Sequence, residues 1–158
     1  YQYYIYLPAQ PLIRPATRSG ASNTTEMFVS QINWINNSGT GYGTLVYLAV
    51  DSSGALYLSP QQGFAFVNDA PVTVDSNPAN KWIKMTYVIK STSSSDGYLQ
   101  VYANDKLILN QTRATLPASN YTNMLKVGIY NAYLSAAASA YDTQVVFFDG
   151  FSTSTTNF

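Results

Sequence analysis

The chain has 158 residues, a formal net charge of zero, 46% hydrophobic residues and 10% charged residues. This length predicts a single domain, residues 1–158, with its own core, and the sparse, balanced charge argues against nucleic acid or membrane insertion. The sequence contains no cysteine and no histidine, which excludes disulfides, thiolate metal sites and a histidine general base. Any catalysis must therefore use tyrosine, lysine, arginine or carboxylates.

The first half of the sequence consists of short predicted strands separated by turns. Residues 1–7 are aromatic or aliphatic on both faces, which predicts a strand that ends at Pro8. Two connections without strand periodicity cover residues 8–25 and 69–80, and Asp-Ser-Ser-Gly at 51–54 is typical of a hairpin turn. The other strands predicted here cover residues 26–35, 44–50, 55–58 and 63–68.

The second half shows the clearest alternation of apolar and polar residues. The strand at 82–90 has an apolar face made by Ile83, Met85, Tyr87 and Ile89. Asn104-Asp105 predicts a tight turn between strands at 98–103 and 106–110. The last strands are predicted at 124–131 and 143–151. Because helical periodicity is nowhere sustained, the pattern predicts an all-β sandwich or jelly roll.

Two of these strands carry polar side chains on one face. Alternation puts Lys126, Gly128 and Tyr130 on one side of their strand. The residues on the other side are Leu125, Val127 and Ile129. It likewise puts Gln31 and Asn33 on one face of the strand at 26–35. Each of the two strands would thus offer a polar or phenolic face backed by an apolar one.

A further polar surface is predicted where Tyr98, Gln100 and Tyr102 share a strand face. Aromatic rings beside amides suit carbohydrate, and Asn33 is another candidate sugar contact. With 14 tyrosines in the chain, an outer face without a ligand is the alternative. Asn-x-Ser/Thr sequons are glycan acceptors in exported proteins, or else chance matches. They occur in or beside predicted turns at Asn23, Asn36, Asn110 and Asn120.

The order of these features resembles the concanavalin A-like jelly roll of polysaccharide lyases, especially alginate lyases and their heparin-lyase and glucuronan-lyase relatives. The resemblance runs through nearly the whole chain and implies that fold, although the family's first strands have no counterpart. The matching segments are Tyr6-Leu7-Pro8, Gln31-Ile32-Asn33, Lys81-Trp82-Ile83, residues 97–105, residues 125–131 and Phe148-Asp149-Gly150.

The resemblance implies β-elimination on a uronic acid. In that reaction a carboxylate is neutralised, a proton leaves C5 and another is given to the leaving oxygen. Carried over by position, Gln31 would contact the carboxylate and Tyr130 would act as acid or base. Lys126 beside it could lower the tyrosine pKa from its reference value of about 10.

The sequence departs from the family at two places that matter for this chemistry. Asn33 stands where the family has a histidine, and an amide cannot take up a proton at neutral pH. The strand that carries the family's neutralising arginine has no counterpart, because the chain begins too late. We therefore interpret the protein as a non-catalytic, secreted cell-surface protein with a structural or carbohydrate-binding role. The alternative is a polysaccharide lyase acting through Tyr130 and Gln31.

A jelly roll without its first strands would also have an unpaired sheet edge. A strand donated by another copy, from residues 1–7 or from the tail at 151–158, would cover this edge and could build an open filament. The expected partners are thus a polysaccharide or glycan and a second copy of the chain, at an extracellular location. No cofactor is expected; calcium near Asp142 or Asp149 is conceivable, but no ligand spacing specifies it.

Overall fold

The computed structural model describes residues 1–9, 27–51, 53–62, 67–68, 70–130 and 145–155. The described part of the chain contains strands and turns but no helix, and so none that could cross a membrane. Its strands are β1 Gln2–Tyr6, β2 Met27–Asn36, β3 Tyr42–Val50, β4 Leu56–Gln62, β5 Val67–Asn68, β6 Val72–Asp75, β7 Trp82–Lys90, β8 Tyr98–Ala103, β9 Lys106–Thr112, β10 Tyr121–Tyr130 and β11 Phe147–Ser152.

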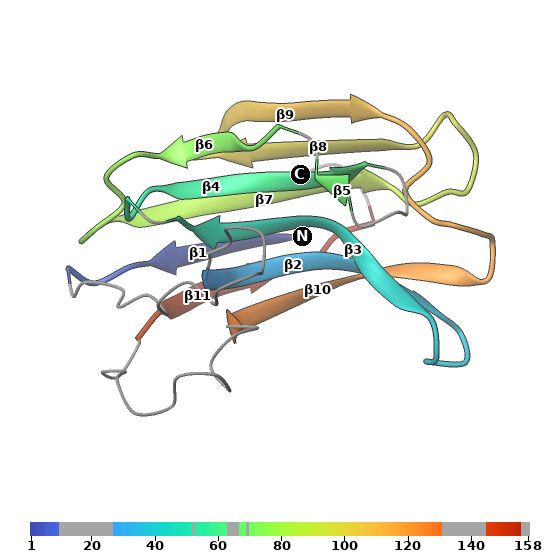
Figure 1. The fold of residues 1–158 in the computed structure, drawn as a ribbon, viewed down its shortest axis with the longest axis horizontal. Coiled ribbons are helices and arrows are strands. Elements are labelled where there is room, and N and C mark those ends of the chain that lie inside the picture. The colour runs from blue at the N-terminus through green and yellow to red at the C-terminus, as the bar shows by residue number, and fades with distance from the viewer. Residues whose placement is uncertain (10–26, 52, 63–66, 69, 131–144, 156–158) are drawn as a thin grey trace, which may run out of the picture.

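The strands form two antiparallel sheets packed face to face (Figure 1). Sheet I has the order β11-β1-β7-β8-β9, and sheet II has the order β10-β2-β3-β4-β5, with β6 also paired to β4. Figure 1 shows the strands of both sheets running in the same general direction, which is the aligned packing of a β-sandwich. The predicted all-β jelly-roll class is confirmed.

The core lies between the two sheets and follows the predicted alternation. Tyr3 and Ile5 of β1 are fully buried, and the core positions of β7 and β8 are buried as well, except for Ile89 near the end of β7, which is only partly buried. A hydroxyl cluster crosses this core: the Tyr3 hydroxyl lies 2.5 Å from Ser30 Oγ and 3.2 Å from the Tyr87 hydroxyl. The cluster satisfies polar groups that would otherwise be unpaired in the core, and it links sheet I to sheet II.

The described strands overlap the expected ones, with ends that differ by a few residues; β10, for example, begins at Tyr121 rather than at residue 124. Two differences are larger. The connection expected at 69–80 contains β6, whose pairing with β4 overrides the neighbouring prolines. The strand expected at 55–58 continues to Gln62. The Asn104-Asp105 turn is confirmed, because both residues have positive φ angles of 48° and 65°. The expected connection at 8–25 lies almost wholly outside the described residues.

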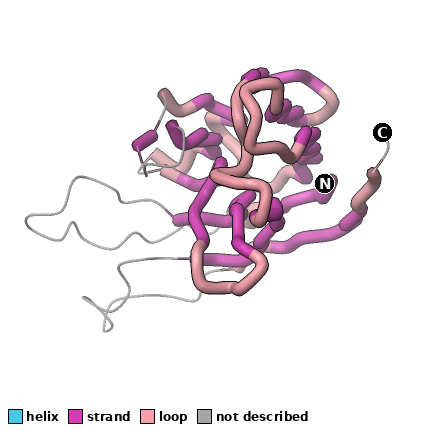
Figure 2. The backbone as a smooth tube through the Cα atoms, turned by 90° about the vertical axis from the view of Figure 1, so that its right-hand side faces the viewer, coloured by secondary structure: helices cyan, strands magenta, loops and turns pink. Residues whose placement is uncertain are grey.

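The strand-donation hypothesis is wrong about the segment 1–7. β1 is flanked on both sides by strands of its own chain, with Gln2 opposite Ser152 of β11 and opposite Thr86 of β7. β11 in turn includes the start of the proposed donor tail at 151–158. The first and last described strands therefore lie side by side, as Figures 1 and 2 show. β1 and the first two residues of the tail thus belong to strands that are paired within the chain.

The simple alternation expected along β10 breaks at Gly128. The register with β2 shifts between Val127 and Tyr130, and Gly128 has a φ of +135°, a conformation that other residues rarely adopt. Leu125 packs against the core as expected, but Val127 and Ile129 are each 39% exposed. A bulge at the edge of sheet II therefore removes the apolar backing expected for this end of the strand.

We expect Gly43→Ala to destabilise the fold by about 1–3 kcal/mol, because a larger residue overpacks a filled site. A Cβ on Gly43 would overlap Cζ2 of the Trp34 ring, which packs over this glycine from the neighbouring strand. Urea unfolding followed by tryptophan fluorescence measures the change. Thr44→Ala, at the next position of β3, is the control, and an equal loss in both variants would contradict this packing argument.

Candidate active site

The predicted residues of sheet II gather on its outer face, which is turned away from the core. Lys126 of β10 pairs directly with Gln31 of β2, which pairs with Tyr47 of β3. Ser59 of β4 continues the same row. Directly opposite residues of neighbouring strands share a face, with Cβ atoms about 4.5–5.5 Å apart. The row therefore joins a cation and an amide from strands far apart in the sequence.

Asn33 lies in the next row of this outer face, between Met124 and Thr44. It is only 2% exposed, and its Nδ2 lies 3.5 Å from Gln31 Oε1, a long hydrogen bond. Within the described residues its Oδ1 has no hydrogen-bond partner. Because Asn33 donates to the Gln31 oxygen, the Gln31 Nε2 group is the end left to donate to a ligand.

A small aromatic cluster forms the part of this face next to Gln31. The rings of Phe28 and Tyr47 meet edge to face with centroids 4.6 Å apart, and Tyr57 packs against Tyr47 at 6.4 Å. The backbone register places Tyr130 opposite Phe28, three residues before Gln31 on β2, or about 10 Å along that strand. The backbone register thus puts Tyr130 and Gln31 in neighbouring regions of one sheet.

Lys126 supplies the positive charge of the row on the outer face of sheet II, where the pairing of β10 with β2 places it. Its side chain is exposed, and its Nζ lies 5.4 Å from the ring centroid of Tyr42. Three other described lysines, in β7 and in the turns beside sheet I, are instead paired with carboxylates, in Lys81–Asp75, Lys84–Asp105 and Lys90–Asp96. Lys126 therefore keeps its charge available to an anionic ligand. Its direct neighbour is Gln31 rather than Tyr130.

The described residues contain no group of three or more Asp, Glu, His or Cys side chains that could hold a metal ion. Asp149, one of the two carboxylates considered for calcium, accepts a hydrogen bond from the backbone N–H of Gly150 at 2.7 Å. The other, Asp142, lies outside the described residues. Asp149 thus offers a single carboxylate to a cation.

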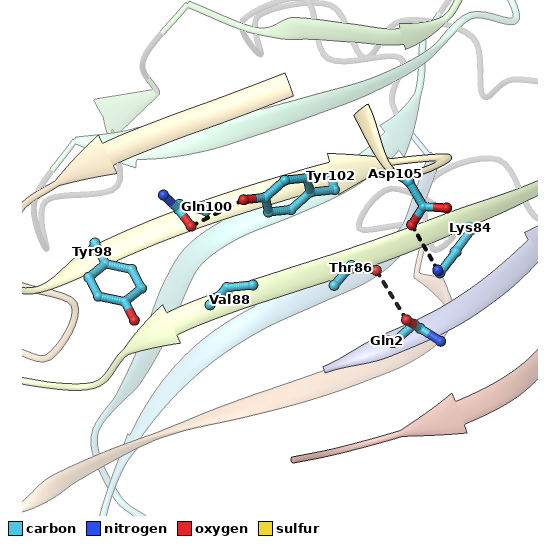
Figure 3. Close-up of a pocket in the computed structure, with 8 residues that line it drawn as sticks. All are labelled: Gln2, Lys84, Thr86, Val88, Tyr98, Gln100, Tyr102 and Asp105. Carbon is cyan, nitrogen blue, oxygen red and sulfur yellow. Dashed lines mark hydrogen bonds and ion pairs between the residues drawn. The ribbon is translucent and has the colours of Figure 1, made fainter. Parts of the chain in front are cut away.

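The predicted sugar contacts do not form one site. Tyr98, Gln100 and Tyr102 share the outer face of sheet I, as expected, and line a groove of about 460 Å³ there (Figure 3). Asn33 belongs to sheet II, on the far side of the core. Gln2 and three residues of β7 also line this groove and were not among the predicted sugar contacts, although the alternation of β7 puts Lys84, Thr86 and Val88 on its outer face.

The family model for polysaccharide lyase matches residues 16–152. The chain belongs to the polysaccharide lyase family. A search of the curated proteins gives no match. This family assignment contradicts the interpretation of the chain as a non-catalytic structural protein and favours the alternative, a lyase. Asn33 in place of the family's histidine is thus compatible with membership of this family, and β1 has no unpaired edge that would require a filament.

Solved lyase structures share the fold of this polysaccharide lyase family member. The endo-β-1,4-glucuronan lyase from the fungus Trichoderma reesei is 15% identical with a TM-score of 0.64, over 94% of this chain and 64% of that one. A doubly mutated alginate lyase Aly36B in complex with alginate trisaccharide is 16% identical with a TM-score of 0.56, over 94% and 66%. The chain thus spans less than two thirds of the length of either structure.

Proposed function

We propose that the protein is a polysaccharide lyase that cleaves a uronate-containing polysaccharide by β-elimination. The observation that carries the proposal is the row on the outer face of sheet II, where Lys126 and Gln31 are directly paired. A cation and an amide donor at one place suit the carboxylate of a uronic acid, because charge-assisted hydrogen bonds are the stronger kind. The family match supports the reaction class.

In the proposed reaction, Gln31 Nε2 and Lys126 Nζ bind the uronate carboxylate and reduce its negative charge. This stabilises the charge that develops when the C5 proton leaves. Tyr130, as phenolate, takes the C5 proton; the C4–O bond breaks and a C4=C5 double bond forms. Tyr130 then gives the same proton to the leaving oxygen, so that one group serves as base and acid and ends in its starting state.

This scheme gives Asn33 a positioning role in place of proton transfer. Its Nδ2 donates to Gln31 Oε1 at 3.5 Å, which turns the Gln31 amide so that its N–H groups are left for the substrate. The amide at this position therefore helps to bind the carboxylate, while the proton steps fall to Tyr130. In this scheme both proton transfers take place at Tyr130, so the reaction does not need a histidine.

The proposed substrate is a glucuronan or an alginate, the polymers named in the two similar structures. A polymeric substrate supports the proposal of an extracellular protein. Among the sequons, Asn110 and Asn120 are exposed, whereas Asn36 uses its side chain to hold the turn at Thr40. Asn110 lies within β9 rather than beside a turn, and Asn23 lies outside the described residues.

The test is an elimination assay on purified protein with glucuronan, alginate and heparin. We expect ultraviolet absorbance to rise as unsaturated uronate ends form from at least one of the three polymers, and the rate to be unchanged after treatment with a metal chelator. Mass spectrometry of the products should show chains with one unsaturated end. Absence of unsaturated product from all three polymers would overturn the proposed function.

A further inference from the structure

The groove on the outer face of sheet I is separate from the candidate active site. Figure 3 shows its lining side chains projecting from β1, β7 and β8 and from the turn after β8. The core of the sandwich lies between this groove and the row that contains Gln31. A ligand in the groove would therefore not touch the residues proposed for elimination.

Hydrogen bonds between side chains hold the polar groups of the groove in place. Tyr102 donates its hydroxyl hydrogen to Gln100 Oε1 at 3.3 Å, and Gln100 Nε2 donates to Asn110 Oδ1 at 3.2 Å. Thr86 Oγ1 donates to Gln2 Oε1 at 3.4 Å. In the part of the chain that the structure describes, the Gln2 amide N–H groups are left without a partner. Oriented donors thus line the floor of the groove.

The positive and negative side chains that line the groove neutralise each other. Its two charged lining residues, Lys84 and Asp105, form an ion pair of 2.8 Å at one end (Figure 3). The hydrogen bond that Lys84 donates to the Asp105 carboxylate raises the pKa of Lys84, so the lysine stays charged and paired at neutral pH. No unpaired charge remains among the lining residues to attract a uronate. The groove is therefore suited to an uncharged ligand.

Aromatic rings lie along and beside the groove. Tyr98 and Tyr102 are four residues apart on β8, or about 13 Å along the strand. Beyond the ion pair, Trp82 is 50% exposed and its ring centroid lies 5.3 Å from that of Tyr6. Rings with an apolar face and a polar edge, next to fixed amide donors, match the apolar ring faces and hydroxyl groups of a pyranose chain.

We propose that this groove is a non-catalytic binding site for an uncharged polysaccharide chain. The rings of Tyr98 and Tyr102 stack on sugar rings, and the amides of Gln2 and Gln100 hydrogen-bond their hydroxyl groups. The site is independent of the lyase activity proposed for the other sheet. It holds the protein on a neutral glycan while the outer face of sheet II is free to act on a uronate.

Isothermal titration calorimetry with cellohexaose, xylohexaose and mannohexaose tests this site. The protein is made in bacteria, so that no glycan on Asn110 enters the groove. We expect saturable binding of at least one oligosaccharide, and about tenfold weaker binding when both tyrosines are changed in Tyr98→Ala/Tyr102→Ala. Gln2→Ala leaves both tyrosines in place and removes one amide donor, so it should also weaken sugar binding. Tyr42→Ala, an exposed tyrosine on the other sheet, is the matched control.

Three outcomes overturn the proposal. The first is that none of the three hexasaccharides binds. The second is that the double variant, folded by circular dichroism, binds as tightly as the unchanged protein. The third is a dimer in size-exclusion chromatography that the double variant abolishes without any sugar binding, which would assign the groove to a second copy of the chain. Tyr130→Phe should keep the sugar binding, so the failure of the lyase proposal would be seen separately.

Discussion

Tyr130→Phe is expected to lower kcat for β-elimination by about 10²–10⁴-fold, with a much smaller change in KM. The substitution removes one oxygen, and with it the only group to which the proposed reaction assigns proton transfer; a positioned acid or base contributes a factor of this size. The carboxylate contacts of Gln31 and Lys126 remain, so substrate binding should persist. Initial rates of unsaturated product formation against polymer concentration give both constants.

The matched control for this variant is Tyr98→Phe, which makes the same chemical change on the opposite sheet. It should leave kcat unchanged, because sheet I contributes no group to the elimination. Gln31→Ala should instead raise KM more than it lowers kcat. If Tyr130→Phe retains more than about a tenth of the rate, another group transfers the proton and the assignment to Tyr130 is wrong.

The local parts of the fold could be predicted because each strand carries its own alternation. β8 is buried at every second position, as the period of two indicates. In β7 the period holds for Ile83, Met85 and Tyr87, whereas Ile89 is only partly buried. The groove residues Tyr98, Gln100 and Tyr102 were found by the same rule. β6 was missed because a strand of four residues between prolines has no periodicity of its own and depends on its partner β4.

Features that depend on long-range pairing could not be read from the sequence. Nothing local indicates that Lys126 lies opposite Gln31, or that β1 is enclosed by β7 and β11. The interpretation of residues 1–7 as a donor strand failed for this reason, since a strand that is apolar on both faces fits an internal position equally well. The bulge at Gly128 likewise needs the neighbouring strand to define it.

The buried tyrosine pair of the core makes the fold sensitive to alkali. Burial raises the pKa of Tyr3 well above its ordinary value of 10, with the nearby Tyr87 adding to the effect, and burial also raises the pKa of Tyr87. Both hydroxyls belong to the cluster that includes Ser30. The groups that shift these two pKa values are Ser30 and the two tyrosines themselves, none of which can compensate the charge of an ionised phenol.

The sign of the pH dependence follows from these raised values. Above about pH 10 an unfolded tyrosine loses its proton, whereas the folded protein keeps both protons. The unfolded state then binds fewer protons, so the free energy of unfolding falls as pH rises. Each tyrosine contributes a slope of about 1.4 kcal/mol per pH unit, or about 2.7 kcal/mol for the pair, from pH 10 up to the raised native pKa values. Below pH 10 the pair contributes no pH dependence.

Urea unfolding measured between pH 8 and 12, by far-ultraviolet circular dichroism, tests this expectation. The contribution of these two tyrosines to the free energy of unfolding should stay constant up to about pH 10 and then fall steeply as the pH rises. Tyr87→Phe should make the slope smaller by about 1.4 kcal/mol per pH unit, because the contribution of Tyr87 is removed while that of Tyr3 remains. Tyr42→Phe removes a tyrosine that is 64% exposed and should leave the slope unchanged. Equal slopes in all three proteins would mean that the core cluster opens before its tyrosines ionise, and that the alkaline loss of stability comes from elsewhere in the chain.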